Sequence, residues 1–408
     1  MTCELLLKGG TVVDPAQGLY GLRDVAINQG KITALEPDIP IGDAQEVIDA
    51  TDLIVTPGLI DIHTHVAETI VSLATAPDEV GVCSGVTTVC DAGSTGYANL
   101  TGFKKWVIPQ AQTDVFCFLH LSPVGEAVLP EIGWERVSAE RMRETIEENR
   151  DVVKGVKLRA TVNMIEALGI EALKTARRVV SDAGLPIMIH LGIDAGETIA
   201  AEALDAFGRE MLSCLGKGDV LTHAFTNKQG GVIRPDGSVT PGLRKAVQRG
   251  VVLDVASAIG HLDFQVARQA IERGLLPTTL STDFTTFLLG APVPFSLPVL
   301  MSEFLALGLS LKQVVEMTTI NPARVLGEEQ RRGSLGLGMP ADVSLFELLE
   351  GDFAFVDSRD GNQLRGEQLL VSQLSLKRGA RVETAPRFQK YAQWSHDVIQ
   401  MLAHADEE

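Results

Sequence analysis

The chain has 408 residues, of which 45% are hydrophobic, 22% are charged and 5% are aromatic. This composition is typical of a globular protein, and the length suits one large domain with a smaller accessory domain. The formal net charge of −18 argues against nucleic acid and anionic membranes as partners, because contacts with phosphate groups need clustered Lys and Arg.

The five cysteines are odd in number and form no Cys-x-x-Cys pair: Cys3, Cys83, Cys90, Cys117 and Cys214. They predict reduced, mostly buried thiols and argue against a redox motif or a thiolate zinc site. The N-terminal residues lack a signal-peptide pattern, and no apolar stretch approaches the roughly 20 residues of a membrane span. We therefore expect a soluble, cytoplasmic protein.

Short alternating strands and turns precede Pro57. Strands are predicted over residues 4–8, 11–13, 24–28 and 31–35, with a hairpin turn at Gln29-Gly30. Strands return at residues 353–356 and 368–376, where they could complete the same sheet. We predict a small β-sandwich domain built from residues 1–55 plus 339–385, and a C-terminal helix with an acidic tail over 386–408.

Strands alternate with helices between residues 56 and 338. Apolar segments predict strands over 54–62, 86–91, 115–120, 155–160, 186–190, 220–223, 251–255 and 278–283. Helical periodicity marks segments such as 139–149, 165–183 and 264–273. Eight such strands predict an α/β fold, a (β/α)8 TIM barrel over residues 56–338. An open doubly wound sheet is the alternative, but the first strand lacks a following Gly-x-Gly-x-x-Gly.

His63 and His65 end the first of these strands, two residues apart. On a strand both imidazoles point to the same side, which provides half of a metal site. For an isolated His-x-His pair, one core histidine and one surface histidine would be an equally good interpretation. The rest of the chain has to decide between the two.

Four further strands end in ionisable side chains: Lys157, His190, His223 and Asp283. In a parallel barrel these strand ends share one rim, where active sites of this architecture lie. Taken alone, His190 could be a core histidine, Lys157 a snorkelling lysine and Asp283 a helix N-cap. Together with the first pair they predict a centre for zinc, manganese or iron, with zinc as the default.

Lys157 is the unusual member of this set, because an ammonium group would be repelled by divalent cations. A neutral amine that has reacted with carbon dioxide would instead give an anionic carbamate, whose two oxygens can bridge two metals. A salt-bridged lysine on the barrel wall is the alternative. Lys154 is another candidate carrier, on the opposite face of the strand.

The run Pro57 to His65, followed in order by Lys157, His190, His223 and Asp283, resembles the amidohydrolase superfamily. Residues 319–327 and 338–346 resemble its closing segments, so the resemblance covers nearly the whole chain. The branch it is similar to contains dihydroorotase, hydantoinase and isoaspartyl dipeptidase. More narrowly, residues 85–94, 155–161 and 276–283 resemble a dihydroorotase-like group of deacetylases.

The resemblance implies a binuclear metal-dependent hydrolase of deacetylase type, acting on the ester or amide bond of a small acylated hydroxy or amino acid. One divalent ion would be held by His63, His65 and Asp283, and the other by His190 and His223, with carboxylated Lys157 as the bridge. Metal-activated hydroxide would attack the carbonyl, with Asp283 as general base and then acid. The implied cofactors are two divalent ions, zinc by default, and carbon dioxide as the lysine carbamate. A homo-oligomer is also expected.

Two departures from the family bear on the substrate. The family's dihydroorotases have the pattern His-x-His-x-Arg at the first strand. This chain has Ala67 at the position of that Arg. Hydantoinases place a Tyr shortly after the bridging lysine, where this chain has Arg159, Thr161 and Asn163. Arg159 could hold a substrate carboxylate or the oxyanion, or form a structural ion pair. His120, His261 and Asn227 are further candidates for substrate contacts, with Asn227 in a Gly-rich loop that suits a lid.

Three alternative functions remain at this point. A cyclic amidohydrolase of dihydroorotase or hydantoinase type loses support from the two departures. A mononuclear deaminase would use His63, His65, His223 and Asp283, but the His-x-x-Glu that such enzymes carry is absent after His190. A non-catalytic scaffold related to hydantoinases is the third, although scaffolds usually lack the ligands present here.

Overall fold

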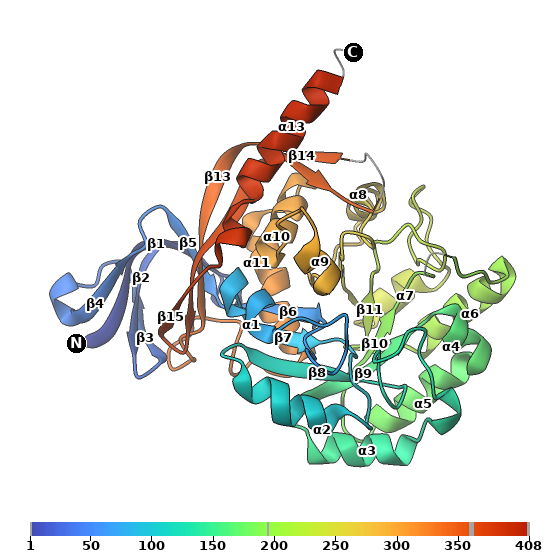
Figure 1. Cartoon of the computed structure of the whole chain (residues 1–408). Coiled ribbons are helices and arrows are strands. Elements are labelled where there is room, and N and C mark those ends of the chain that lie inside the picture. The colour runs from blue at the N-terminus through green and yellow to red at the C-terminus, as the bar shows by residue number, and fades with distance from the viewer. Residues whose placement is uncertain (1, 194–195, 359–362, 406–408) are drawn as a thin grey trace.

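The computed structural model describes residues 2–193, 196–358 and 363–405. Figure 1 shows two parts, a curled antiparallel sheet built from both ends of the chain and a helix-covered parallel sheet from its middle. Among the described residues, no helix is long and apolar enough to cross a membrane. The five cysteines form no disulfide, and Cys3, Cys90 and Cys117 are buried.

The parallel sheet contains seven strands in the order β12-β11-β10-β9-β8-β7-β6. They are β6 (Leu59–Thr64), β7 (Val86–Asp91), β8 (Asp114–His120), β9 (Val153–Arg159), β10 (Ile187–His190), β11 (Val220–Thr222) and β12 (Val252–Leu253). Nearly all of their residues are buried, as expected for parallel strands covered on both faces. The predicted parallel α/β architecture is confirmed.

The predicted eighth strand, 278–283, forms no strand ladder. It makes isolated bridges instead, Asp254 to Thr279 and Thr64 to Phe284. These bridges join the segment to residues beside β12 on one side and to β6 on the other, so it closes the barrel without becoming a regular strand. The backbone of Asp283 has a φ of 52°, and this left-handed turn interrupts the extended conformation that a ladder requires.

The predicted first strand, 54–62, is also divided. Its first half is β5 (Leu53–Pro57), which belongs to the antiparallel sheet, and its second half is β6. Gly58 separates them, and a Cβ atom at this position would lie 2.2 Å from Thr87 Oγ1. The close approach of β7 therefore requires glycine where the chain passes from one sheet to the other.

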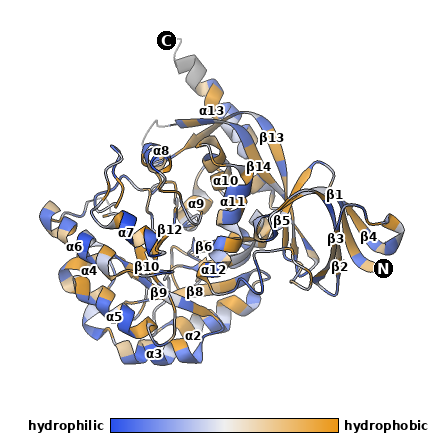
Figure 2. Ribbon diagram, turned by 180° about the vertical axis from the view of Figure 1, so that it is seen from behind, coloured by the Kyte–Doolittle hydropathy of each residue, from blue (hydrophilic) through white to orange (hydrophobic). Residues whose placement is uncertain are grey.

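Helices cover the outside of the parallel sheet. Those that follow β8 to β12 are α3 (Ala139–Glu148), α4 (Val162–Ala167), α5 (Ile170–Val180), α6 (Ala201–Cys214), α7 (Leu243–Gln248) and α8 (Phe264–Glu272). Figure 2 shows hydrophilic and hydrophobic residues mixed on α3, α5 and α6, as expected of helices with one buried face. The single helix predicted over 165–183 is two helices, since Gly169 between them has a φ of 53°.

Shorter and later helices complete the barrel part. They are α1 (Pro77–Val80), α2 (Leu100–Gly102), α9 (Thr286–Gly290), α10 (Leu297–Ala306), α11 (Leu311–Thr318) and α12 (Ile320–Val325). The predicted C-terminal helix is α13 (Tyr391–Ala405), preceded by a 3-10 turn over Pro386–Gln389. Figure 1 shows its C-terminal end projecting from the molecule. Residues 406–408 of the predicted acidic tail lie outside the described residues.

The antiparallel sheet follows one hydrogen-bonded path, β15-β14-β13-β5-β1-β2-β3, with β4 paired to β1. Its strands are β1 (Cys3–Asp14), β2 (Leu19–Asn28), β3 (Lys31–Glu36), β4 (Ala44–Asp49), β5, β13 (Val343–Val356), β14 (Gln363–Lys377) and β15 (Ala380–Glu383). Leu345 of β13 pairs with Val55 of β5, which confirms the predicted union of N- and C-terminal strands. Both residues belong to an apolar cluster that the sheet shares with Leu5, Val12 and Leu376.

Candidate metal centre

His63, His65 and Asp283 form the first candidate metal group, and all three are buried. Asp283 Oδ1 lies 3.2 Å from His63 Nε2 and 3.1 Å from His65 Nε2. Two ligands bound at about 2.1 Å to one tetrahedral zinc ion stand about 3.4 Å apart. The donor atoms of this group are therefore spaced as a single ion needs them.

Backbone pairing brings these three side chains together. The amide of Asp283 donates to His63 O at 2.7 Å, and the amide of His65 donates to Phe284 O at 3.0 Å. Asp61 strengthens the junction, since its carboxylate accepts hydrogen bonds from the Thr282 hydroxyl and from the amides of Thr282 and His63. The first strand and the irregular closing segment thus set one another's geometry.

The imidazole of His63 is oriented by a chain of hydrogen bonds on its far side. Thr222 Oγ1 lies 2.7 Å from His63 Nδ1 and donates its proton to Asp254 Oδ2 at 2.8 Å. A hydroxyl has one proton, so it accepts from His63 Nδ1–H, and the lone pair of Nε2 faces the site. Burial raises the pKa of Asp254 to about 6, although hydrogen bonds from Thr279, Thr222 and Ser281 lower it.

The ring of His65 is held in the same way, with Nδ1 2.9 Å from Ser94 Oγ and Nε2 toward Asp283. Sequence reasoning missed Ser94, Thr222 and Asp254 as supporting residues. Asp254 is the penultimate residue of the seventh predicted strand, so its position near the barrel rim was a usable signal. The two hydroxyl residues carried no signal, because Ser and Thr are common at strand ends for many reasons.

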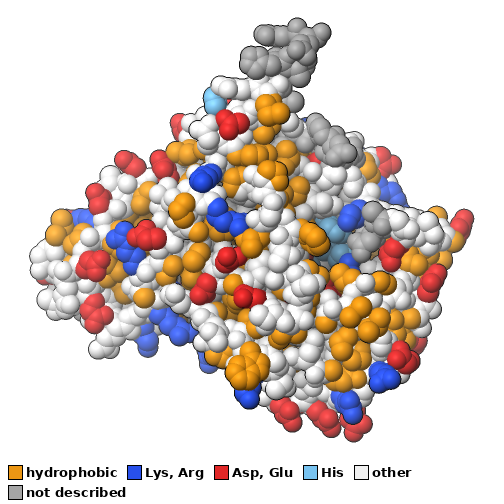
Figure 3. All heavy atoms as spheres, in the orientation of Figure 1, with side chains coloured by type: hydrophobic (Ala, Val, Ile, Leu, Met, Phe, Trp, Pro, Cys, Tyr) orange, Lys and Arg blue, Asp and Glu red, His pale blue; other side chains and the backbone are white. Residues whose placement is uncertain are grey.

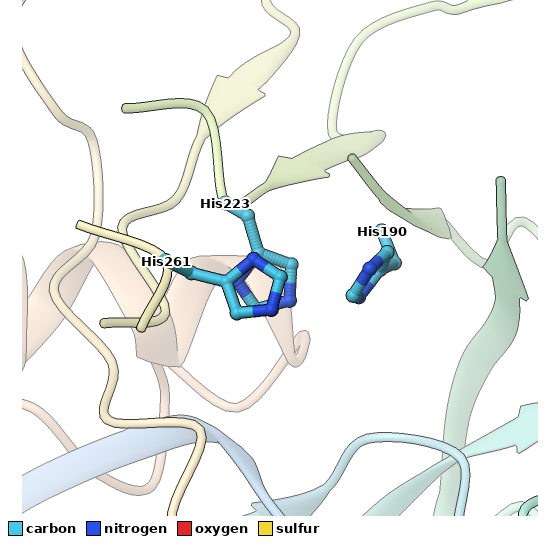
Figure 4. Close-up of side chains that lie close together, drawn as sticks. All are labelled: His190, His223 and His261. Carbon is cyan, nitrogen blue, oxygen red and sulfur yellow. The ribbon is translucent and has the colours of Figure 1, made fainter. Parts of the chain in front are cut away.

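His190, His223 and His261 form the second candidate metal group. Figure 4 shows the ring of His261 overlying that of His223, with His190 opposite, and the ring centroids of the overlying pair are 4.0 Å apart. His223 Nδ1 donates to Ala256 O at 2.7 Å, while its buried Nε2 has no hydrogen-bond partner among the described residues. His190 Nε2 donates to Gly192 O at 3.2 Å, which leaves Nδ1 as its lone-pair nitrogen.

The two groups are adjacent. Asp283 Oδ2 lies 3.8 Å from His223 Nε2, so the carboxylate that completes the first group also faces the second. The structure therefore brings together all five predicted imidazole and carboxylate ligands. It also places His261, which the sequence suggested as a substrate contact, against His190 and His223.

Lys157 lies at the first group, with Nζ 3.0 Å from His63 Nε2 and only 1% of the residue exposed. Burial lowers its pKa, which favours the neutral amine that can react with carbon dioxide. Lys154, the alternative carrier, instead forms an ion pair with Glu328 at 2.6 Å. Lys157 thus fits a carbamate bridge in position and protonation, and Lys154 is engaged elsewhere.

Electrostatics favour the protonation states that metal binding needs at every ligand histidine except His65, whose pKa burial alone would lower but Glu126 and Asp283 raise. Burial, followed by the charge of Lys157, lowers the pKa of His63 to about 3, and burial lowers the pKa values of His190 and His223 well below the usual range. Burial alone would raise the pKa of Asp283, but the neighbouring imidazoles lower it well below its ordinary value. Neutral imidazoles and an ionised carboxylate are the forms that coordinate cations.

Two buried glutamates near this centre were missed by sequence reasoning. Glu126 Oε2 lies 3.9 Å from His65 Nδ1, and Glu131 Oε1 accepts a hydrogen bond from Arg159 Nη1 at 2.8 Å. The structural ion pair considered for Arg159 is thus present. Both glutamates lie in the loop after β8, a segment without apolar periodicity, and no sequence signal connected them to the strand ends.

The other predicted substrate contacts are also engaged with protein groups. Asn227 Nδ2 donates to Asp263 Oδ2 at 2.8 Å, and Lys228 Nζ lies 2.9 Å from His261 Nε2. His120 is fully buried at the end of β8, beside Lys157 on β9. In Figure 3, imidazole surface is visible within a hollow flanked by basic side chains, so this region opens to the outside.

Comparisons with known proteins agree with this arrangement. The model of the amidohydrolase family matches residues 54–366. A deacetylase of Agrobacterium fabrum, Atu3266, is 30% identical over 374 residues, which cover 90% of this chain and 89% of that protein. The crystal structure of a dihydroorotase superimposes with a TM-score of 0.80 at 28% identity, covering 93% of this chain and 98% of that one.

The crystal structure of an adenine deaminase superimposes with a TM-score of 0.83 at 29% identity, covering 94% of this chain and all of that one (100%). The family match spans both candidate metal groups and Lys157. The chain belongs to the amidohydrolase family and is a hydrolase.

Proposed function

We propose that the chain is a binuclear metal-dependent deacetylase, which hydrolyses the ester or amide bond of a small acylated hydroxy or amino acid. The observation that carries the proposal is the approach of buried Lys157 Nζ to His63 Nε2, at 3.0 Å. The lysine is therefore in contact with the first group, and it lies near enough to His190 and His223 to influence their pKa values. A carboxylated lysine at this place would supply two oxygens, one for an ion in each group.

Formation of the bridge is a simple addition. The neutral amine of Lys157 attacks the carbon of carbon dioxide, a nitrogen–carbon bond forms, and one carbon–oxygen π pair moves onto oxygen. The nitrogen then loses a proton to solvent, so the product is an anionic carbamate with two oxygen ligands. When bound, the two divalent ions, zinc by default, would supply the electrostatic activation of a water molecule and of the scissile carbonyl.

Asp283 is suited to proton transfer in this reaction. Its ionised carboxylate takes a proton as the water oxygen bonds to the carbonyl carbon, and it returns the proton as the bond to the leaving oxygen or nitrogen breaks. Because the carboxylate contacts imidazoles of both groups, it would be in reach of a substrate carbonyl held between them.

We propose Arg159 as the group that holds the substrate carboxylate. The planar guanidinium matches the geometry of a carboxylate, and the hydrogen bond from Nη1 to Glu131 orients the side chain. The buried ion pair prevents the guanidinium from swinging away from the barrel rim. His261 and Asn227 stay predicted substrate contacts of this site.

The relatives named after other reactions define the competing functions. Ring opening of a dihydroorotate-like cyclic amide is disfavoured, because Ala67 is fully buried where an Arg would bind the substrate carboxylate. Deamination at one ion is disfavoured by the second imidazole group. Deacetylation is therefore favoured over the dihydroorotase and adenine deaminase reactions for this chain.

A substrate panel tests the proposal. Metal-loaded protein should be assayed against N-acetyl amino acids and O-acetyl hydroxy acids of both hands, together with dihydroorotate, hydantoins and adenine. Acetate release from one acylated series, with about two ions per chain, is the expected result. Turnover of adenine or a cyclic amide alone, or full activity with one ion, would overturn the proposal.

A further inference from the structure

His120 lies against the proposed carbamate carrier. It is the last residue of β8 and pairs in register with Lys157 of β9, so both side chains stand on the same face of the sheet. A Cβ atom at Gly93 would meet Lys157 Cγ at 2.6 Å and His120 Cδ2 at 3.0 Å. The missing side chain of Gly93 therefore leaves room for the lysine stem and the imidazole edge together.

The hydrogen bonds of His120 fix its tautomer. Nδ1 accepts from the backbone amide of Ser122 at 2.9 Å, so the proton of the neutral ring is on Nε2. Burial holds the ring neutral, since it lowers the pKa of His120 to about 3. The ring nitrogen next to Cδ2 is thus an N–H donor at the Lys157 side.

This donor has no acceptor. His120 is fully buried, and Nε2 has no hydrogen-bond partner among the described residues. A buried donor left unsatisfied costs about 1 to 3 kcal/mol, so an orphaned donor at this site calls for an explanation. Trp134, whose ring centroid is 6.1 Å from that of His120, offers only another donor, Nε1.

We infer that His120 Nε2–H donates a hydrogen bond to an oxygen of the Lys157 carbamate, an inference that rests on the proposed function. The unmodified lysine gives Nε2 no hydrogen-bond partner in the structure, whereas carboxylation adds anionic oxygens beside the imidazole. His120 is then a positioning residue, because it stabilises the carbamate and fixes its plane, and it acts on the reaction only through Lys157.

Carbamate content tests the inference directly. The metal-free protein should be incubated with ¹³C-bicarbonate, the carbamate carbon followed by NMR, and metal loading titrated against bicarbonate. His120→Asn is the informative variant, since its amide oxygen can still accept from the Ser122 amide but its side chain is too short to reach Lys157. A hydrogen bond to an anion contributes about 1.5 to 3 kcal/mol, and about 1.4 kcal/mol corresponds to a factor of ten, so we expect about a 10- to 150-fold higher bicarbonate requirement.

Two matched variants separate this role from a structural one. His120→Gln places an amide N–H near the position of Nε2 and should restore bicarbonate dependence to within about threefold of the wild type. Trp134→Phe changes the other neighbour of the ring and should leave the carbamate signal unchanged. If His120→Asn does not fold, His120→Gln and His120→Phe provide the same comparison of donor present and donor absent.

The possible outcomes have distinct meanings. A His120→Asn protein with normal carbamate content overturns the inference, and a raised KM at unchanged carbamate content would make His120 a substrate contact instead. A wild-type protein without any carbamate signal, at full metal content, would overturn the binuclear proposal itself. The two failures are therefore distinguishable.

Discussion

Thr222 Oγ1 and His63 Nδ1 are 2.7 Å apart, and the same hydroxyl donates to Asp254 Oδ2. This contact selects the tautomer of His63 that presents its Nε2 lone pair to the first metal group. Groups that orient a metal-binding histidine typically contribute 10- to 100-fold to metal affinity or activity.

Thr222→Val removes the hydroxyl at nearly constant volume and leaves Asp254 with one donor fewer. We expect metal affinity at the first group to fall by about 10- to 100-fold, measured by competition with a chromogenic chelator. Thr222→Ser keeps the hydroxyl and should bind metal within about threefold of the wild type. Equal affinities for the Val and Ser variants would show that the contact has no role in orienting His63.

Asp283→Asn tests proton transfer. Asn keeps an oxygen atom that could ligate a metal ion beside His63 and His65, but it cannot accept a proton at neutral pH. General acid–base groups contribute about 10²- to 10⁴-fold, so kcat on the best substrate of the panel should fall by that factor while metal content, measured by elemental analysis, stays near the wild-type value. Undiminished turnover would refute the assignment of Asp283 as the base.

The strand ends of the site could be predicted from the sequence, because a buried parallel strand is a local apolar run and its last residue is visible as a change to polar. His190 and His223 were found in this way. The closing segment before Asp283 could not be predicted as irregular, since its turn depends on hydrogen bonds between Thr282 and Asp61, 221 residues apart in the chain. Local propensity favoured a strand there.

The surroundings of the site were less predictable for the same reason. Arg159 had an evident place on a strand, yet its partner Glu131 lies in a loop 28 residues earlier with nothing local to mark it. His261 follows the seventh strand by several residues, and only the fold of that loop shows that its ring overlies His223.

Asp114 links the two parts of the molecule and provides a stability test. Its carboxylate at the start of β8 contacts Lys377 of β14 at 2.8 Å and Arg332 at 2.9 Å. Burial alone would raise the pKa of Asp114, but Lys377 and Arg332 lower it below the ordinary value of 3.8. The stabilisation is therefore fully present above about pH 3.8 and is lost as pH falls through the folded-state pKa.

Asp114→Asn should reduce the free energy of unfolding at pH 7 by about 1 to 3 kcal/mol, because two largely buried cations each lose one of their carboxylate partners and keep only Asp342 or Glu328. Urea denaturation at several pH values measures this, and the difference from the wild type should disappear in acid. Asp352→Asn, at an exposed pair with Arg365, is the control and should be indistinguishable from the wild type. A pH-independent loss for Asp114→Asn would mean that packing, not charge, is responsible.

Glu303 of α10 should make the free energy of unfolding depend on pH in the opposite direction. It is 1% exposed, its Oε2 has no hydrogen-bond partner among the described residues, and burial together with the charge of Asp357 raises its pKa well above 4.5. The native state therefore keeps a proton that the unfolded chain releases above pH 4.5. Stability should fall as pH rises from there toward the folded-state pKa, by up to about 1.4 kcal/mol per pH unit.

Glu303→Gln cannot ionise, so its unfolding free energy should lack this decline. The variant should therefore become progressively more stable relative to the wild type from pH 5 to pH 8. Thermal or urea unfolding of both proteins across that range measures the difference. Because every other titrating group is shared, subtracting the two curves isolates Glu303. A constant difference across the range would show that Glu303 is ionised in the native protein, and that its carboxylate has a compensating cation or donor.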